Sequence, residues 1–210
     1  MLTALVDYDS GNLHSAAKAF QRMAAETGAG AVIVTSRPEE VLRADRVVLP
    51  GDGAFPACKR QLMEATGLFQ AIDEAVTRQG KPFLGICVGM QMLATRGLEY
   101  EPVDGFDWIG GEVVRIDAPG LKVPHMGWND LVIDHPHPVL AGIETGQHAY
   151  FVHSFQFRAA DPAHRLAHVD YGGPVTAIIG RDNLVGTQFH PEKSQAAGLR
   201  LIANFLGWAP

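Results

Sequence analysis

Cys87 is the residue best suited to chemistry by its sequence context. It lies in Gly-Ile-Cys-Val-Gly (85–89), after the apolar stretch Lys81–Ile86 and before a stretch of helical periodicity, Val88–Arg96. Gly-x-Cys-x-Gly between a strand and a helix has the pattern of a nucleophile elbow. Free N–H groups at the helix start favour a thiolate, and the N–H of Val88 is placed to donate to an oxyanion. The pattern predicts a nucleophilic cysteine, although cysteine peptidases and related hydrolases share it.

A base for this thiol is found in Phe-His-Pro-Glu-Lys-Ser (189–194). Pro191 pushes His190 toward an extended conformation, in which side chains two positions apart project the same way. The carboxylate of Glu192 can then reach the imidazole of His190 and fix its tautomer, as a triad requires. Alone, His-Pro-Glu could equally be a turn at a strand end, but the elbow upstream favours the triad. Cys58 has no elbow around it and is interpreted as a buried core residue.

Composition excludes several classes of function. The chain has 210 residues, 47% hydrophobic content and a net charge of −6, without a long run of Lys or Arg, so nucleic acid is not expected as a partner. No apolar stretch is long enough to span a bilayer and the start does not read as a signal peptide, so we expect a cytoplasmic protein that does not bind membranes. Two cysteines form no disulfide framework or zinc pattern, and no metal or cofactor is expected. We expect one domain over 1–210.

The elements that must position these residues alternate in the first half of the chain. Apolar runs predict buried parallel strands, and helical spacing predicts the segments between them. Strands are expected at Leu2–Tyr8, Ala31–Thr35, Arg46–Leu49 and Lys81–Ile86. Helices are expected at Asn12–Glu26 and within Lys59–Arg78, interrupted near Gly67. This rhythm predicts an α/β fold, an open, mostly parallel sheet with helices on both faces.

The second half has shorter strand candidates separated by Gly, Pro and Asp. This spacing favours an antiparallel extension of the sheet. Strands are expected at Glu112–Ile116, Val132–Asp134, Tyr150–Phe157, Arg165–Val169, Val175–Gly180 and Val185–Gln188. A last helix is expected at about Ala196–Leu206, which has apolar residues at helical spacing.

Six motifs, in order along almost the whole chain, resemble a known family. They are DYDSGNLHS (7–15), PGDGAF (50–55), GICVGMQ (85–91), VPHMGWN (123–129), YFVHSF (150–155) and FHPEKS (189–194). Together they resemble class I (triad) glutamine amidotransferases, whose fold is flavodoxin-like, and more narrowly the glutaminase subunits of imidazole glycerol phosphate synthase in histidine biosynthesis.

The resemblance implies a reaction. Cys87 would attack the side-chain amide of glutamine, giving a γ-glutamyl thioester and ammonia. His190 would protonate the ammonia and then activate water, while Glu192 holds the ring. The oxyanion would be met by the backbone of Val88 and of the Gly51–Asp52 turn, where a flexible glycine makes peptide rotation easy. Position 52 is usually small and apolar in the family, and Asp there could raise the barrier to activation.

The resemblance also implies binding residues. The substrate would be held by Gly53, Gln91, Glu99 and the segment Val152, His153, Ser154 and Phe155. From the residues alone, Gln91 could equally be an exposed helix residue and Glu99 a solvated charge. Asn12, Trp128 and Lys193 match family positions at an interface with a cyclase subunit, a (βα)8 barrel. A heterodimer would form, and ammonia would cross this interface into the barrel.

Three other functions remain open from the sequence. One is a triad glutaminase serving a pyridoxal phosphate, purine or anthranilate pathway. Another is a stand-alone cysteine hydrolase or peptidase of similar fold. The third, a catalytically silent regulatory subunit, is disfavoured by the intact triad. Glutamate release with and without a cyclase separates these hypotheses.

Overall fold

The first half of the chain forms the alternating pattern that the sequence predicts. The computed structural model describes residues 1–10 and 13–210. The strands of this half are β1 (Leu2–Val6), β2 (Ala31–Thr35), β3 (Arg46–Gly51) and β4 (Phe83–Cys87). The helices are α1 (Leu13–Thr27), α2 (Pro38–Arg43), α3 (Phe55–Glu64), α4 (Leu68–Asp73), and a π-helical turn over Glu74–Arg78. Helix α2 is an element that the sequence analysis missed, and the expected break at Gly67 is confirmed, with φ +74°.

The main sheet has eight strands in the order β2-β1-β3-β4-β14-β13-β12-β9. The first five strands are parallel, and β13, β12 and β9 follow, each antiparallel to the strand before it in this order. The additional strands are β9 (Val132–Ile133), β12 (Arg165–Asp170), β13 (Pro174–Arg181) and β14 (Leu184–Thr187). The predicted fold class, a mostly parallel sheet with an antiparallel extension, is confirmed.

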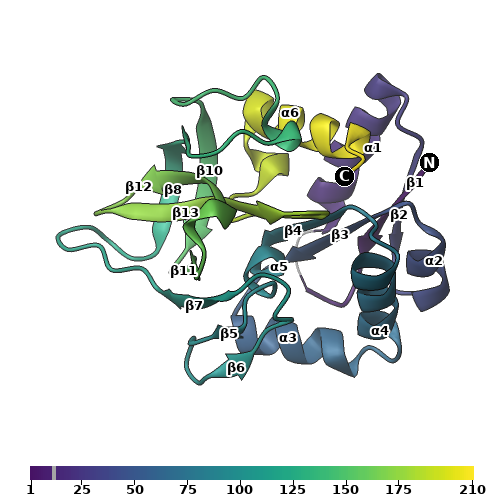
Figure 1. The fold of residues 1–210 in the computed structure, drawn as a ribbon, viewed down its shortest axis with the longest axis horizontal. Coiled ribbons are helices and arrows are strands. Elements are labelled where there is room, and N and C mark those ends of the chain that lie inside the picture. Colours follow the sequence, from purple (N-terminus) through teal and green to yellow (C-terminus); the bar gives the residue numbers. More distant parts are fainter. Residues whose placement is uncertain (11–12) are drawn as a thin grey trace.

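Helices cover both faces of the parallel part (Figure 1). On one face, α1 packs against α6 (Gln195–Gly207), with the rings of Phe20 and Phe205 in edge contact at 6.5 Å. On the other face lie α3 and α4, and α2 packs against α4. No helix among the described residues is long and apolar enough to cross a membrane.

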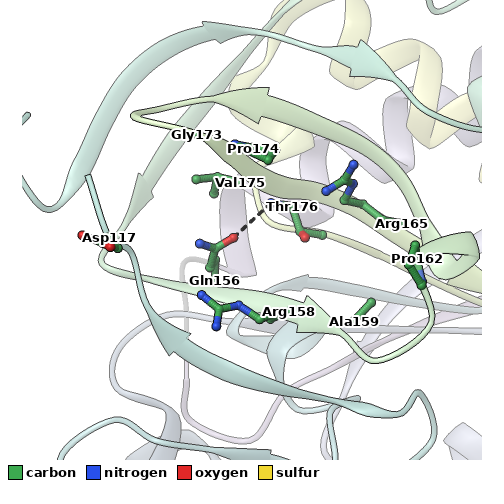
Figure 2. Close-up of a pocket in the computed structure, with 10 residues that line it drawn as sticks. All are labelled: Asp117, Gln156, Arg158, Ala159, Pro162, Arg165, Gly173, Pro174, Val175 and Thr176. Carbon is green, nitrogen blue, oxygen red and sulfur yellow. Dashed lines mark hydrogen bonds between the residues drawn. The ribbon is translucent and has the colours of Figure 1, made fainter. Parts of the chain in front are cut away.

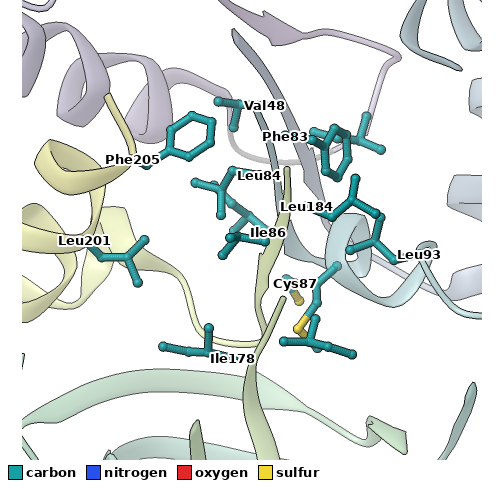
Figure 3. Close-up of a cluster of buried hydrophobic side chains, with 14 of the residues drawn as sticks. Val48, Phe83, Leu84, Ile86, Cys87, Leu93, Ile178, Leu184, Leu201 and Phe205 are labelled. Carbon is teal, nitrogen blue, oxygen red and sulfur yellow. The ribbon is translucent and has the colours of Figure 1, made fainter. Parts of the chain in front are cut away.

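The strand that ends in Cys87 runs through the core. All five of its residues are buried, and Phe83, Leu84 and Ile86 lie among apolar side chains from both neighbouring layers (Figure 3). Phe205 and Leu201 of α6 contribute to this cluster. Burial on both faces accounts for the uninterrupted apolar run in the sequence. It also places the nucleophile at the end of a rigidly packed strand.

Two smaller sheets stand beside the main one, and they correct the predicted strand Tyr150–Phe157. The chain bends at Ser154 and divides this segment into β10 (His148–His153) and β11 (Phe155–Ala159), which belong to different sheets. Strand β10 pairs with β8 (His125–Asp130), a strand that was not predicted. Strand β11 joins a sheet of order β11-β7-β5-β6, with β7 (Gly111–Arg115), β5 (Arg96–Gly97) and β6 (Val103–Asp104).

The helix after Cys87 is shorter than predicted. Helix α5 covers Val88–Gln91 and not Val88–Arg96, because the next loop takes the hydrogen bonds that would continue it. The carbonyl of Met92 accepts from the N–H of Phe106 at 2.7 Å, and that of Leu93 accepts from Trp108 and Ile109 at 3.0 Å each. With one turn of helix, the charge effect at Cys87 depends on nearby N–H groups, not on a long macrodipole.

Candidate active site

Cys87 lies in a strained turn between β4 and α5. Its backbone has φ +55° and ψ −112°, a region that residues with a side chain rarely occupy. A Cβ at Gly85 would lie 2.5 Å from the carbonyl oxygen of Gly89, and a Cβ at Gly89 would lie 1.8 Å from that of Leu49. Both glycines are therefore required by the close approach of backbone, as expected of an elbow.

A Gly89→Ala substitution should test this turn. The new methyl group cannot fit against the Leu49 carbonyl, so we expect a loss of about 3 kcal/mol or more in the free energy of unfolding. Urea denaturation measures this. Gly207→Ala is the matched control, because Gly207 also lies in a helix and a Cβ there meets nothing within 4 Å. Equal midpoints for the two variants would contradict a packing requirement at Gly89.

His190 and Glu192 form a buried pair beside Cys87. Nδ1 of His190 lies 3.0 Å from Oε1 of Glu192, and their side chains are 8% and 3% exposed. Because the carboxylate only accepts, Nδ1 carries the proton and Nε2 is left for the thiol. Burial lowers the pKa of His190, but hydrogen bonds to Cys87 and Glu192 outweigh it and raise the pKa to about 10. The site therefore favours an imidazolium next to the sulfur.

The geometry of this pair differs from the predicted one. His190 is extended, with φ −90° and ψ 102°, but Pro191–Lys193 forms a 3-10 turn. The contact is made because the turn brings the carboxylate back to Nδ1 of the ring. Two bonds anchor His190: its N–H donates to the carbonyl of Tyr150 at 3.2 Å, and Oγ of Ser194 donates to the carbonyl of His190 at 2.7 Å.

The order of strands brings the predicted oxyanion turn to the nucleophile. In the β3–β4 register, Gly51 pairs with Cys87. A Cβ at Gly51 would lie 2.8 Å from the backbone nitrogen of Gly89 and 2.9 Å from the hydroxyl of Tyr8. That hydroxyl donates to the carbonyl of Pro50 at 2.8 Å. Burial raises the pKa of Tyr8, so the phenol stays a donor.

The Asp52 N–H is already occupied in this structure. It donates to Oγ of Ser10 at 3.3 Å, and the same hydroxyl lies 3.1 Å from the Asp52 carbonyl oxygen. Cys58 supports this contact, with its sulfur 3.5 Å from that oxygen and 3.1 Å from the Ser10 hydroxyl. Burial raises the pKa of the Cys58 thiol, consistent with a neutral donor in the core. Sequence reasoning missed Ser10, although it belongs to the quoted DYDSGNLHS motif.

A cavity of about 230 Å³ lies over the nucleophile. It is smaller than the pockets of roughly 300–1,000 Å³ that take drug-sized ligands, and so fits a ligand of amino-acid size. Every residue predicted to hold the substrate lines it. The lining residues are Asp52, Gly53, Cys87, Val88, Gln91, Glu99, Pro124, Val152, His153, Ser154 and Phe155.

Two of these residues resolve alternatives that the sequence left open. Gln91 is 3% exposed, so it is not an exposed helix residue. Its Nε2 donates to Oε1 of Gln188 at 3.0 Å and to the carbonyl of Phe155 at 3.3 Å. Glu99 is half-buried, and its Oε2 accepts the N–H of Phe55 at 2.8 Å, capping α3. Its carboxylate is held in place and is not freely solvated.

His153 is a buried, neutral histidine. Burial lowers its pKa to about 4, and its Nδ1 donates to the carbonyl of Phe155 at 2.7 Å. Its Nε2 then accepts from Nδ1 of His125, 3.2 Å away on β8. The pair fixes the bend between β10 and β11 that forms one wall of the cavity.

Two of the residues predicted at an interface, Trp128 and Lys193, are not among those that line this cavity. Trp128 is 49% exposed on β8, and Met126 on the same strand is 63% exposed. Lys193 is half-buried in the turn that carries the triad. Asn12 lies outside the described residues.

A larger cavity, of about 410 Å³, lies apart from the triad between β11 and β13 (Figure 2). Gln156, Arg158 and Arg165 line it, without a nucleophile or a triad member. Among the described residues, no three His, Cys, Asp or Glu side chains come together as metal ligands would.

Known proteins resemble this chain over its whole length. The family model for glutamine amidotransferase class-I matches residues 4–207. Subunits HisH of imidazole glycerol phosphate synthase from Cereibacter sphaeroides, Ruegeria pomeroyi and Rhodospirillum rubrum are 73%, 66% and 62% identical, each covering 100% of both chains.

Solved structures share the fold at lower identity. A crystal structure of a glutamine amidotransferase has a TM-score of 0.72 at 19% identity and covers 98% of this chain and 99% of its own. The glutaminase domain of Trypanosoma brucei CTPS has a TM-score of 0.69 at 15% identity, covering 100% and 95%. With the elbow geometry and the matching relatives, the chain belongs to the class I glutamine amidotransferases and, within them, to the HisH subunits of imidazole glycerol phosphate synthase.

Proposed function

We propose that this chain hydrolyses glutamine with Cys87, His190 and Glu192 and delivers the ammonia to a cyclase subunit. The cyclase would use it to make imidazole glycerol phosphate and AICAR in histidine biosynthesis. The observation that carries the proposal is the strained Cys87 at the floor of an amino-acid-sized cavity, with a buried His–Glu pair beside it. The high identity to HisH subunits supports histidine biosynthesis over the purine, pyridoxal phosphate and anthranilate pathways.

In the first step, the Cys87 thiolate attacks the amide carbon of glutamine. The carbonyl oxygen becomes an oxyanion, to which the N–H of Val88 donates. The C–N bond then breaks, and His190 gives its Nε2 proton to the leaving nitrogen, so ammonia and a γ-glutamyl thioester result. Water attacks the thioester while His190 takes its proton, and glutamate leaves with Cys87 restored. Glu192 keeps the proton on Nδ1 and balances the imidazolium charge.

Substrate binding uses the ends of the cavity. The Oε1 atom of Gln91 is free to accept from the ammonium group of glutamine, because its Nε2 is bonded to protein. The carboxylate of Glu99, which also lines the cavity, adds a negative charge for the same ammonium group. The backbone of Val152–Phe155 would meet the substrate's carboxylate. These polar groups select an amino acid.

The second oxyanion donor requires a change in the Gly51–Asp52 turn. The Asp52 N–H now donates to Ser10, so it must rotate away to reach the substrate. One such donor is typically worth about 10²–10³ in rate, so this rotation would control the activity. Docking of the cyclase, through Trp128 and Lys193, would supply the energy for it, and the two chains would form a heterodimer.

A Ser10→Ala substitution should weaken this control. Loss of one hydrogen bond from the resting turn makes rotation easier, and we expect glutamate release without cyclase to rise about 2- to 10-fold. A coupled assay of glutamate formation measures this. Ser36→Ala replaces an exposed serine and serves as the control. Unchanged or lower basal activity would show that Ser10 does not restrain the turn.

The proposal is tested by glutamate release under three conditions: glutamine alone, glutamine with the cyclase, and both with the cyclase's nucleotide substrate. We expect low basal turnover and strong stimulation by the complete mixture. Equal turnover in all three would favour a stand-alone hydrolase. Cleavage of peptides would favour a peptidase.

A further inference from the structure

Gln188 lies directly beside the nucleophile. Strand β14 runs parallel to β4 and pairs Thr187 with Ile86, so the next residues, Gln188 and Cys87, are neighbours across the sheet. The Gln188 side chain is fully buried. Its Nε2 donates to Sγ of Cys87 at a distance of 3.7 Å. Among the described residues, this sulfur is the acceptor found for the side-chain amide N–H of Gln188.

A chain of hydrogen bonds fixes which end of the amide faces the sulfur. The carbonyl of Phe155 can only accept, so the nitrogen of Gln91, 3.3 Å away, must be the end that faces it. The same nitrogen donates to Gln188 at 3.0 Å, so Gln188 turns its oxygen to Gln91. The nitrogen of Gln188 is thereby directed at Cys87. His153 also donates to the Phe155 carbonyl, at 2.7 Å.

We propose that Gln188 is a catalytic residue that donates an N–H to the Cys87 thiolate and holds the sulfur in position for attack. A thiol sulfur is a weak acceptor, and an ionised one forms a stronger, charge-assisted bond. A buried amide N–H without another acceptor therefore favours the ionised sulfur. This role rests on the proposed nucleophilic function of Cys87, and it adds a side-chain donor to the sulfur.

A purely structural role predicts a different result. Gln188 could serve only to accept from Gln91 and so keep the substrate cavity in shape. In that case its loss would disturb substrate binding and raise KM. The reactivity of the sulfur toward a small reagent would not change. The two roles are therefore separated by measuring the reactivity of the Cys87 sulfur.

The test is Gln188→Met, which keeps the length of the side chain and removes both polar ends. Iodoacetamide is reacted with the full chain across a range of pH, and labelling at Cys87 is followed by mass spectrometry, which separates it from Cys58. We expect labelling of Cys87 at pH 7 to fall about 10-fold, because the sulfur loses its hydrogen-bond donor. In the complex with the cyclase, glutamine-dependent kcat should fall similarly, and a rise in KM would report the separate loss of the acceptor for Gln91.

Gln156→Met is the matched control, because it replaces another buried glutamine, 8% exposed, in the separate cavity of Figure 2. It should leave the labelling profile of Cys87 unchanged. A parental profile in Gln188→Met would overturn the inference, and a raised KM with that profile would assign the structural role. Labelling does not depend on glutamine, so it tests the role of Gln188 alone. The proposed function has its own test: it would fail if a Cys87→Ala variant still released glutamate. Circular dichroism checks that both variants fold.

Discussion

Cys87→Ala should abolish glutamine-dependent synthesis and leave synthesis from ammonium salts intact. The variant lacks the nucleophile, and loss of a nucleophile from a catalytic triad lowers kcat by roughly 10⁴-fold or more. Ammonia supplied from solution bypasses the missing step, because the acceptor site is proposed to lie on the cyclase. Cys87 is 5% exposed at the cavity floor, so alanine removes one atom from the core surface and the chain should still fold.

Both activities are measured on the reconstituted complex, with glutamine in one series and an ammonium salt in the other. Cys58→Ala is the control. Cys58 is the second cysteine, and the Asp52 carbonyl that it contacts is also contacted by Ser10. It should keep glutamine-dependent synthesis. Loss of both activities in Cys87→Ala would mean that Cys87 supports the fold or the interface and is not the nucleophile.

Glu192→Gln should give the second large effect. Gln keeps an oxygen that can accept from Nδ1 of His190 at the observed 3.0 Å, so the change removes the charge and retains the shape. Without the negative charge, the imidazolium that forms beside Cys87 loses its buried counter-charge. We expect glutamine-dependent kcat to fall about 10²-fold or more. Glu26→Gln, on an exposed carboxylate of α1, is the control.

The pH profile should move with it. Burial lowers the pKa of His190, and the contacts with Cys87 and Glu192 raise it to about 10, above the ordinary value. Activity that needs a protonated His190 therefore persists through neutral pH and falls as pH rises toward about 10. Removing the charge of Glu192 lowers the pKa, so the alkaline limb of kcat/KM should shift to lower pH. An unshifted limb would show that Glu192 does not set the protonation of His190.

The same shift affects stability. Since the pKa of His190 is raised in the folded chain, its protonation stabilises the fold fully below the unfolded value, about 6.5, and this contribution disappears as pH rises through the folded pKa. Glu192→Gln should therefore lose stability at pH 6 and lose little near pH 10. Urea denaturation at the two pH values measures the difference.

The sequence alone determined the elements whose signals are local. The apolar run before Cys87 predicts β4 because a strand buried on both faces is apolar at every position. The glycines at 85 and 89 predict a turn in which a Cβ cannot fit, and the structure has backbone at 2.5 and 1.8 Å from those positions. The contact between His190 and Glu192 could be predicted because the two residues are only two positions apart in the chain.

Tertiary structure decided the features that depend on distant pairings. Strand β8 and the division of Tyr150–Phe157 follow from β10 and β11 joining different sheets, which no periodicity within the segment records. Helix α5 ends at Gln91 because loop residues far along the chain bond its next carbonyls. The bond from the Asp52 N–H to Ser10 and the bond from Gln188 to Cys87 join residues 42 and 101 positions apart. Local sequence carries the nucleophile and its base, but the groups that restrain and polarise them are brought there only when the strands assemble into one sheet.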